Sequence, residues 1–393
     1  MQFLMGEVDG VDDTPEVPFH PLRLAFLAEL SRSVMADARS KAHPELASFA
    51  FWSRRANLER LVAGADRGRL RLGLGMVFHV SPSNVPVNFA YSLVFSLLAG
   101  NTSVVRLSSR ASVEADVLVD ILARVLADPK FAVLRSAIHL IRYERDDRIT
   151  EFWLAHALGR IVWGGDATVE HMRSLKTHPR CREVAFVDRF SMAVIDARSV
   201  VQADLATIGE LCAGLFNDIY VMNQYACSSP QLLAWLGTRA DVAAGQARLW
   251  PQFLTHAARK FAPEPVEAMD KFVALCNEAL DFSNIVTVQW RGTPLTRIEL
   301  GTLGVDPCGQ RGYLGTIHEY GVERLDEVAH LVDPRFQTLS YFGVAPAVWR
   351  EFVTTHRLKG IDRIVPIGRS LEMDFCWDGF DMIASLSRII DVQ

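Results

Sequence analysis

Residues 72–110, with the sequence LGLGMVFHVSPSNVPVNFAYSLVFSLLAGNTSVVRLSSR, constrain the fold of this chain most strongly. The pattern predicts an apolar strand over residues 76–80, a turn through SPSNVP, a helix that stops before Asn101, and a second strand over residues 103–107. A strand, a helix and a strand in this order form a right-handed crossover between parallel strands. Ligands bind at the carboxyl ends of such strands, so the SPSN and RLSSR segments are predicted to face a ligand.

A second unit of this kind follows, with helices predicted over residues 111–127 and 146–158 and a strand over residues 137–142. The segment IVWGGD then ends a short strand at Gly164 and Gly165, directly before another helix. Paired glycines at such a turn let the backbone approach a phosphate or a nicotinamide, and the following helix N-terminus favours anions. Glycines also mark ordinary tight turns, so the pair alone leaves both interpretations open.

Cationic and hydroxyl side chains follow the second strand of the first unit. Arg106 and Arg110 supply positive charge there. Ser108 and Ser109 add hydroxyl groups, and the combination suits a ribose phosphate. The chain has no GxGxxG motif, which is the usual dinucleotide-binding fingerprint. The alternative interpretation is a turn followed by a cluster of solvated charges.

The stretch NDIYVMNQYACSSPQ, residues 217–231, contains one cysteine, Cys227, between two amides and a Ser-Ser-Pro run. This context predicts a thiol on a loop at the end of a core element, where it can meet a substrate. The alternative is a buried structural cysteine, since a lone cysteine usually behaves as a small hydrophobic residue. A reactive thiol needs an environment that stabilises its thiolate form.

Composition excludes several classes of protein. The chain has 393 residues, enough for two or three domains, and 50% of them are hydrophobic. A net charge of −5 argues against nucleic acid as the main partner. Six scattered cysteines without CxxC spacing predict neither a zinc site nor a disulfide framework, so a cytoplasmic location is expected. The most apolar run is about 15 residues long, which indicates a buried helix and no membrane span. Residues 1–17 are acidic and are interpreted as a loose leader or strap.

Taken together, these motifs resemble the aldehyde dehydrogenase superfamily. More closely, HVSPSNVP, GNTSVVRLSS, IVWGGD, NQYACSSPQ and the late GIDRIVPIG with WDG resemble the acyl-CoA reductase (LuxC) family, the fatty-acid reductase component of bacterial bioluminescence operons. The resemblance runs from about residue 72 to residue 385. It implies two three-layer α/β domains with a cofactor and catalytic cleft. Residues 1–187, with a return segment 345–393, would form the cofactor domain, and residues 188–344 would form the catalytic cysteine domain.

The resemblance also implies roles for individual residues. Cys227 matches the catalytic nucleophile, and Asn84 matches the asparagine whose amide stabilises the oxyanion. Arg106 stands where the superfamily has a lysine near the adenine ribose. Ser109 stands where many NAD-preferring members carry a glutamate, so NADPH is favoured over NADH. The residues assigned to the cofactor are Ser81, Pro82, Ser83, Arg106, Ser108, Ser109, Gly164 and Gly165.

The chain lacks the ELGG-type segment that supplies a hydrolytic glutamate in aldehyde dehydrogenases; the region reads REVAFVDRFSMAVID instead. The resemblance therefore implies a reductase that starts from a thioester of coenzyme A, a carrier or a protein. Its product would be a free aldehyde, with no metal required. The alternatives are an NAD(P)-dependent aldehyde dehydrogenase that runs in the oxidative direction, or an acyl-transfer subunit that binds no nucleotide. A homodimer or homotetramer is expected by analogy.

Overall fold

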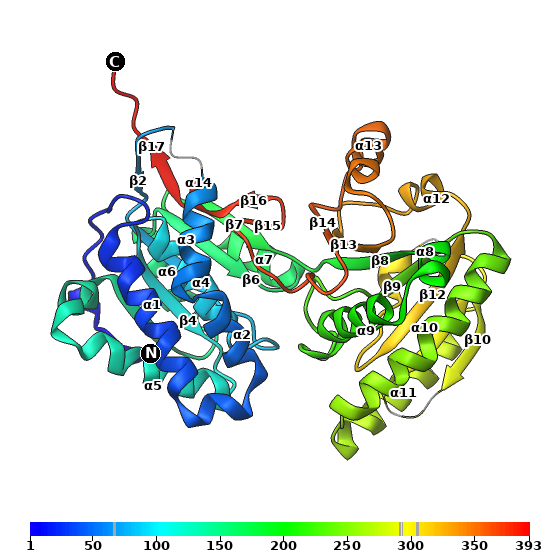
Figure 1. Cartoon of the computed structure of the whole chain (residues 1–393). Coiled ribbons are helices and arrows are strands. Elements are labelled where there is room, and N and C mark those ends of the chain that lie inside the picture. The colour runs from blue at the N-terminus through cyan, green and yellow to red at the C-terminus, as the bar shows by residue number, and fades with distance from the viewer. Residues whose placement is uncertain (66–67, 291, 293, 304–305) are drawn as a thin grey trace. The chain divides into compact units, whose positions relative to one another are not determined.

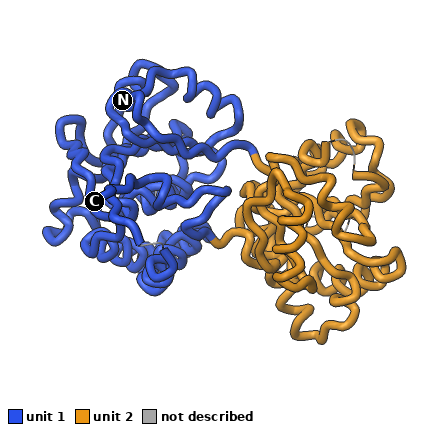
Figure 2. The backbone as a smooth tube through the Cα atoms, turned by 90° about the horizontal axis from the view of Figure 1, so that it is seen from above, with its two compact units in different colours: residues 1–188, 373–393 blue, residues 189–372 orange. Residues whose placement is uncertain are grey.

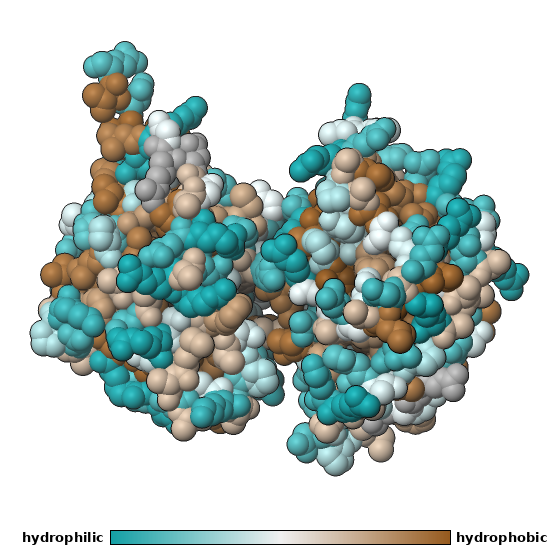
Figure 3. Space-filling view, in the orientation of Figure 1, coloured by the Kyte–Doolittle hydropathy of each residue, from teal (hydrophilic) through white to brown (hydrophobic). Residues whose placement is uncertain are grey.

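The computed structural model describes residues 1–65, 68–290, 292, 294–303 and 306–393. The chain divides into two compact units (Figures 1 and 2). Unit 1 comprises Met1–Asp188 and Met373–Gln393, and unit 2 comprises Arg189–Glu372. The visible face of each unit mixes hydrophilic and hydrophobic residues (Figure 3).

Unit 1 contains a six-stranded sheet with the order β1-β5-β4-β3-β6-β7. Its strands are β1 (Gln2–Met5), β3 (Met76–Val80), β4 (Thr102–Leu107), β5 (Ile138–Arg142), β6 (Gly159–Trp163) and β7 (Arg182–Phe186). β3 is parallel to both β4 and β6, which confirms the predicted parallel strands. β1 pairs antiparallel with β5 at one edge, so the interpretation of the N-terminal segment as a loose leader was wrong. The apolar side chains of β1 pack against the core despite their acidic neighbours.

Helices cover both faces of this sheet. They are α1 (Pro21–Ala36), α2 (Pro44–Trp52), α3 (Arg55–Gly64), α4 (Asn88–Leu98), α5 (Val113–Ala127), α6 (Asp147–His156) and α7 (Asp166–Ser174), with 3-10 turns at Val8–Gly10, Ala38–Ala42 and Pro129–Ala137. Alternate strand residues point to opposite faces. Val77 and Val105 therefore pack against α1, α4 and α5, whereas Phe78 and Val104 pack against α6 and α7. Every residue of α4 is buried, which fits its apolar sequence.

The chain returns to unit 1 at Met373. The returning elements are β15 (Cys376–Trp377), β16 (Phe380–Asp381), α14 (Met382–Ser385) and β17 (Ser387–Ile389), and β17 pairs with β2 (Arg71–Gly73). Residues 345–372, which we assigned to the first domain, lie in unit 2 instead. The reason is that β14 (Arg363–Pro366) pairs with β13 of the second sheet.

Unit 2 contains a seven-stranded sheet with the order β10-β11-β12-β9-β8-β13-β14. Its strands are β8 (Phe190–Asp196), β9 (Leu232–Leu236), β10 (Ile285–Trp290), β11 (Thr296–Leu300), β12 (Thr316–Val322), β13 (Phe336–Phe342) and β14. The helices are α8 (Ala197–Gln202), α9 (Leu205–Tyr220), α10 (Arg239–Lys260), α11 (Pro265–Asp281), α12 (Leu325–Ala329) and α13 (Pro346–His356), with a 3-10 turn at Pro307–Gly309. One face packs against α8, α9 and α10 and the other against α12 and α13, which makes a second three-layer unit.

Candidate active site

In unit 1, the SPSN turn leaves β3 beside the end of β4. The backbone N–H of Ser81 donates to the carbonyl oxygen of Arg106 over 3.1 Å. The Ser81 hydroxyl is buried and has no hydrogen-bond partner among the described residues. Ser83 and Asn84 are exposed, so the Asn84 amide is accessible at the carboxyl edge of the sheet.

Arg106 lies next to this turn at the end of β4. Its guanidinium carbon lies 4.5 Å from the centre of the Tyr143 ring, and its Nη2 donates to the Tyr143 carbonyl over 3.5 Å. Its Nε is buried without a hydrogen-bond partner among the described residues. An unpaired buried donor and an unpaired buried hydroxyl at one sheet edge fit the oxygen atoms of a sugar phosphate. Ser109 is exposed, whereas the Ser108 hydroxyl accepts the Arg110 N–H over 3.1 Å and so closes a turn.

The glycine pair follows β6. A Cβ atom at Gly164 would meet the Thr168 side chain at 2.8 Å, so close packing excludes a larger residue there. A Cβ atom at Gly165 would meet nothing within 4 Å, and Gly165 is the N-cap of α7. The exposed backbone at Gly165 can approach a ligand. Asp166 occupies the first turn of α7, and its negative charge weakens the attraction of this helix end for a phosphate.

The order β4-β3-β6 brings these segments to one edge of the sheet. The turn after β3, the RLSSR segment after β4 and the glycine pair after β6 all follow the carboxyl ends of neighbouring parallel strands. His79 in β3 belongs to the core and not to this edge. It is buried, its Nδ1 lies 2.8 Å from the Ser92 hydroxyl, and burial lowers its pKa to about 3.

In unit 2, the candidate thiol lies on the loop between α9 and β9, residues 221–231, which we term the Cys227 loop. The side chain of Cys227 is exposed, whereas Ser228, Ser229 and Pro230 are buried. The Ser191 hydroxyl donates to the Cys227 carbonyl oxygen over 2.6 Å. The backbone of Cys227 is therefore fixed by a hydrogen bond, while its side chain faces solvent.

Two buried glutamine amides hold the rest of the Cys227 loop. The Gln224 Nε2 donates to the carbonyl oxygens of Pro230 and Thr316 over 3.0 and 2.9 Å, and its Oε1 accepts the Gly315 N–H over 3.1 Å. The Gln231 Nε2 donates to the Gln224 carbonyl over 3.1 Å. Gln224 has a φ of 67°, in the left-handed region, and these bonds fix that conformation. The sequence pointed to the amides of Asn223 and Gln224, and only the second binds backbone, since the Asn223 Nδ2 donates to Glu267 Oε1 over 3.4 Å.

Helix α11 contributes a third support that sequence reasoning missed. The buried Lys271 Nζ donates to the Leu314 carbonyl over 2.8 Å, and burial lowers the pKa of Lys271 to about 7. The buried Glu278 pairs with His318 Nε2. These partners lie far apart in the chain, so no local sequence motif predicts the contacts. One signal was available: both charged residues lie on one helix face, seven positions apart.

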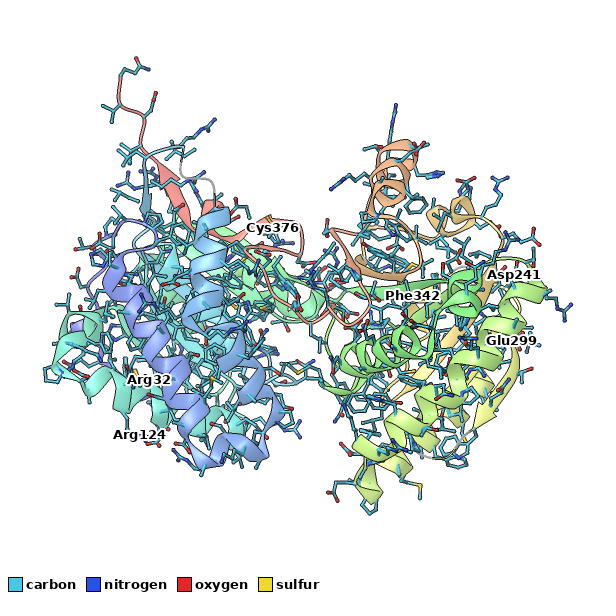
Figure 4. The ribbon with its side chains drawn as sticks, in the orientation of Figure 1. Arg32, Arg124, Asp241, Glu299, Phe342 and Cys376 are labelled. Atoms are coloured by element: carbon cyan, nitrogen blue, oxygen red, sulfur yellow. The ribbon has the colours of Figure 1, made fainter. Side chains whose placement is uncertain are left out.

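The other cysteines have different surroundings. Burial raises the pKa of the Cys181, Cys212 and Cys308 thiols to about 11, so all three stay protonated near neutral pH. Cys376 is exposed in the β15–β16 hairpin of unit 1 (Figure 4), and desolvation raises its pKa as well. Cys276 is exposed on α11. The predicted site residue Cys227 thus differs from them in its braced loop.

The described residues contain no group of three or more His, Cys, Asp or Glu side chains placed to hold a metal ion. In the same described part of the chain, no helix has the length and apolar character needed to cross a membrane. Neither finding bears on the placement of the candidate thiol.

Comparison with known proteins places the candidate residues in one matched segment. Residues 50–242 match the family described as acyl-CoA reductase (LuxC). The long-chain acyl-protein thioester reductase of Vibrio harveyi is 22% identical over 303 residues, which cover 75% of this chain and 58% of that protein. The Aliivibrio fischeri protein of the same name is 24% identical over 163 residues, 42% of this chain and 32% of that protein. The chain therefore spans less than two thirds of either relative.

Solved structures match nearly the whole chain. The 1-pyrroline-5-carboxylate dehydrogenase from Thermus with bound NAD has a TM-score of 0.62 at 12% identity and covers 94% of this chain and 80% of its own. Aldehyde dehydrogenase 21 from Physcomitrella patens, in complex with the reaction product succinate, gives the same TM-score and identity, with 94% and 85% coverage. The predicted aldehyde-dehydrogenase-like fold and the resemblance inferred from the motifs are confirmed.

Proposed function

We propose that this chain, which matches the acyl-CoA reductase (LuxC) family over residues 50–242, reduces an acyl thioester to an aldehyde. The observation that carries the proposal is the exposed Cys227 thiol on a loop braced by two buried glutamine amides. A preorganised, accessible sulfur is what acyl transfer from one thioester to another requires. Cys227, Asn84 and the assigned cofactor residues all lie inside the matched segment.

The proposed reaction balances in two stages. The Cys227 thiolate attacks the thioester carbonyl, the donor thiolate leaves and takes up a proton, and an acyl-enzyme remains. When bound, NADPH supplies a hydride to the acyl carbon. The resulting oxyanion takes up one proton from solvent, and when the bond between carbon and the Cys227 sulfur breaks this proton passes to the sulfur, which yields the aldehyde and restores the thiol. The Asn84 amide and the Cys227 backbone N–H would stabilise the oxyanion in each stage.

The unit 1 edge supports a nicotinamide dinucleotide as the hydride donor. The Arg106 Nε and the Ser81 hydroxyl, which have no hydrogen-bond partner in the part of the chain that the structure describes, fit a sugar phosphate, and the open backbone at Gly165 fits a close ligand. Arg106 and the uncharged Ser109 favour a 2′-phosphate, so we propose NADPH over NADH. Unit 1 would then be the cofactor unit and unit 2 the catalytic one.

The proposed donor is a thioester of coenzyme A, a carrier or another protein. Both relatives are named long-chain acyl-protein thioester reductases, which supports the protein-bound form. We propose that the enzyme acts in the cytoplasm, without nucleic acid, as a homodimer or homotetramer.

Turnover with NADPH tests the proposal. The purified chain should consume NADPH, followed by nicotinamide absorbance, when it receives acyl-CoA of graded chain length or an acylated carrier protein. Cys227→Ser should abolish this consumption and the radiolabelling of the protein by acyl donor, whereas Cys276→Ser should preserve both. Labelling of Cys227 without any NADPH consumption would favour the acyl-transfer alternative. Faster oxidation of aldehyde with NADP than reduction of thioester would favour the dehydrogenase.

A further inference from the structure

Helix α11 buries two charged residues and exposes several of its apolar ones. Lys271 and Glu278 are only 3% and 9% exposed. Met269 and Leu280 on the same helix are 61% and 85% exposed. A helix on the surface of a globular protein normally has the opposite arrangement.

Five exposed residues of α11, which we term the seam, have the spacing of residues that pack against another helix. Val266, Met269, Val273, Cys276 and Leu280 are separated by three, four, three and four positions, and all five are exposed. This is the a and d pattern of a heptad repeat, which packs against another helix. In that register Lys271 and Glu278 occupy the f positions, directly opposite the seam. One orientation of the helix therefore explains both the burial of these two residues and the exposure of the seam.

The seam continues onto the edge of the sheet. The Phe272 ring packs edge-on against Trp290 of β10, with ring centres 6.0 Å apart. Val286 and Val288, also on β10, are 64% and 38% exposed. β10 is the terminal strand of the seven-stranded sheet and lies beside α11 in unit 2 (Figure 1). Contiguous exposed apolar surface of this kind marks interaction sites.

The exposed charges of α11 favour one class of partner. Asp270 occupies the e position beside the seam, Glu264 and Asp281 lie at the two ends of the helix, and all three are exposed and acidic. The one basic residue of the helix, Lys271, is buried. Two copies of α11 would bring acid against acid, and an anionic membrane surface would be repelled as well. A helix with basic flanks would be complementary.

We propose that the outward face of α11, with the exposed side chains of β10, is a docking surface for an amphipathic helix of another protein that carries apolar a and d positions and basic flanks. The helix is 17 residues long, so a partner can follow it for about 25 Å. The opposite face of α11 binds the Leu314 carbonyl and pairs with His318. A docked partner would thus be separated by one helix from the supports of the Cys227 loop. The proposal does not depend on the chemistry of Cys227.

A pair of designed peptides tests the surface in the full-length chain. One fluorescently labelled three-heptad peptide has Leu at a and d and Lys at e and g; the other has Glu at e and g. Fluorescence anisotropy at low salt should show saturable binding of the Lys peptide and at least tenfold weaker binding of the Glu peptide. Met269→Lys/Val273→Lys should weaken binding of the Lys peptide at least tenfold.

The matched control is Val113→Lys/Val133→Lys, which adds the same two charges at exposed positions of unit 1 and should leave binding unchanged. Leu280→Lys is a second variant that tests the seam if the double variant loses its circular dichroism spectrum. Equal binding of the two peptides, no binding, or equal loss in the control would overturn the proposal. So would a wild-type dimer in sedimentation that Met269→Lys/Val273→Lys converts to monomer, or binding to phosphatidylglycerol vesicles that is lost in the same variant.

Discussion

The Nδ1 atom of His318 lies 3.2 Å from the backbone carbonyl oxygen of Gln231, the residue that closes the Cys227 loop. The other ring nitrogen pairs with Glu278 of α11, so one imidazole joins this helix to the loop.

We expect His318→Ala to lower the free energy of unfolding by about 3 kcal/mol, because it leaves a buried carboxylate without its partner. Urea denaturation measures this loss. Glu278→Gln keeps a hydrogen-bonding group and should cost clearly less; a loss below about 0.5 kcal/mol for His318→Ala would show that the pair contributes little.

Lys271 predicts a pH dependence of stability. Burial lowers its pKa to about 7, whereas the pKa in the unfolded chain is near 10.4. Between these values the unfolded state binds a proton that the folded state does not, so this residue makes stability rise with pH from about 7 to 10. In Lys271→Met the rise should be smaller. Urea denaturation at several pH values measures the slope, and Lys359→Met, which removes an exposed lysine, should retain the wild-type slope.

The cysteines should differ in their rates of alkylation. Near neutral pH, iodoacetamide should modify Cys227 before Cys181, Cys212 and Cys308, because burial covers those three or raises their pKa to about 11. Peptide mapping by mass spectrometry gives the order of modification. Cys276 serves as an exposed reference within the same sample. Modification of Cys212 or Cys308 ahead of Cys227 would contradict the placement of the loop.

The glycine pair offers a matched comparison of packing and ligand binding. Gly164→Ala should destabilise the protein by about 1–3 kcal/mol, because its Cβ would lie 2.8 Å from Thr168. Gly165→Ala has open space and a φ of −64°, so it should preserve stability and weaken NADPH binding. Thermal unfolding with and without NADPH separates the two effects. Equal stability of both variants would refute the packing argument.

Asn84→Ala tests the assigned oxyanion donor. We expect kcat for thioester reduction to fall by about 10²–10³. The melting temperature should be unchanged, because the side chain is exposed. Asn277→Ala, which removes an exposed amide from α11, is the control and should keep full kcat. An unchanged kcat in Asn84→Ala would remove this residue from the proposed mechanism.

The parts of the fold that follow from local patterns were predictable. β3 begins and ends at the residues that the apolar run indicated, and its parallel pairing with β4 followed from the order of a strand, a helix and a strand. β1 was missed because four residues in an acidic segment carry too little periodicity, and only their pairing with β5 makes them a strand. The late return at Met373 depends on the pairing of β14 with β13, which is a contact between distant segments.

The candidate site, too, has parts that local sequence patterns predict and parts that depend on contacts between distant segments. Cys227 and the turn that contains Asn84 stood out because serine, proline and amide residues cluster around them. The bonds from Gln224 to Thr316 and from Lys271 to Leu314 join segments 92 and 43 residues apart. Such bonds leave no local signature, so the support of the loop appeared only with the fold.

The late return of the chain to unit 1 has a consequence for the order in which the two units can be completed. Unit 2 is a continuous segment, whereas unit 1 needs residues from both ends of the chain. β2 can form its strand pairing only after β17 has been translated. In the same way, the Asn101 Nδ2 can donate to the Leu386 carbonyl, over 2.9 Å, only at the end of synthesis. The unit that begins first is therefore completed last, and a truncated chain of residues 1–372, released from the ribosome, should hold a protease-resistant unit 2 together with an incomplete unit 1.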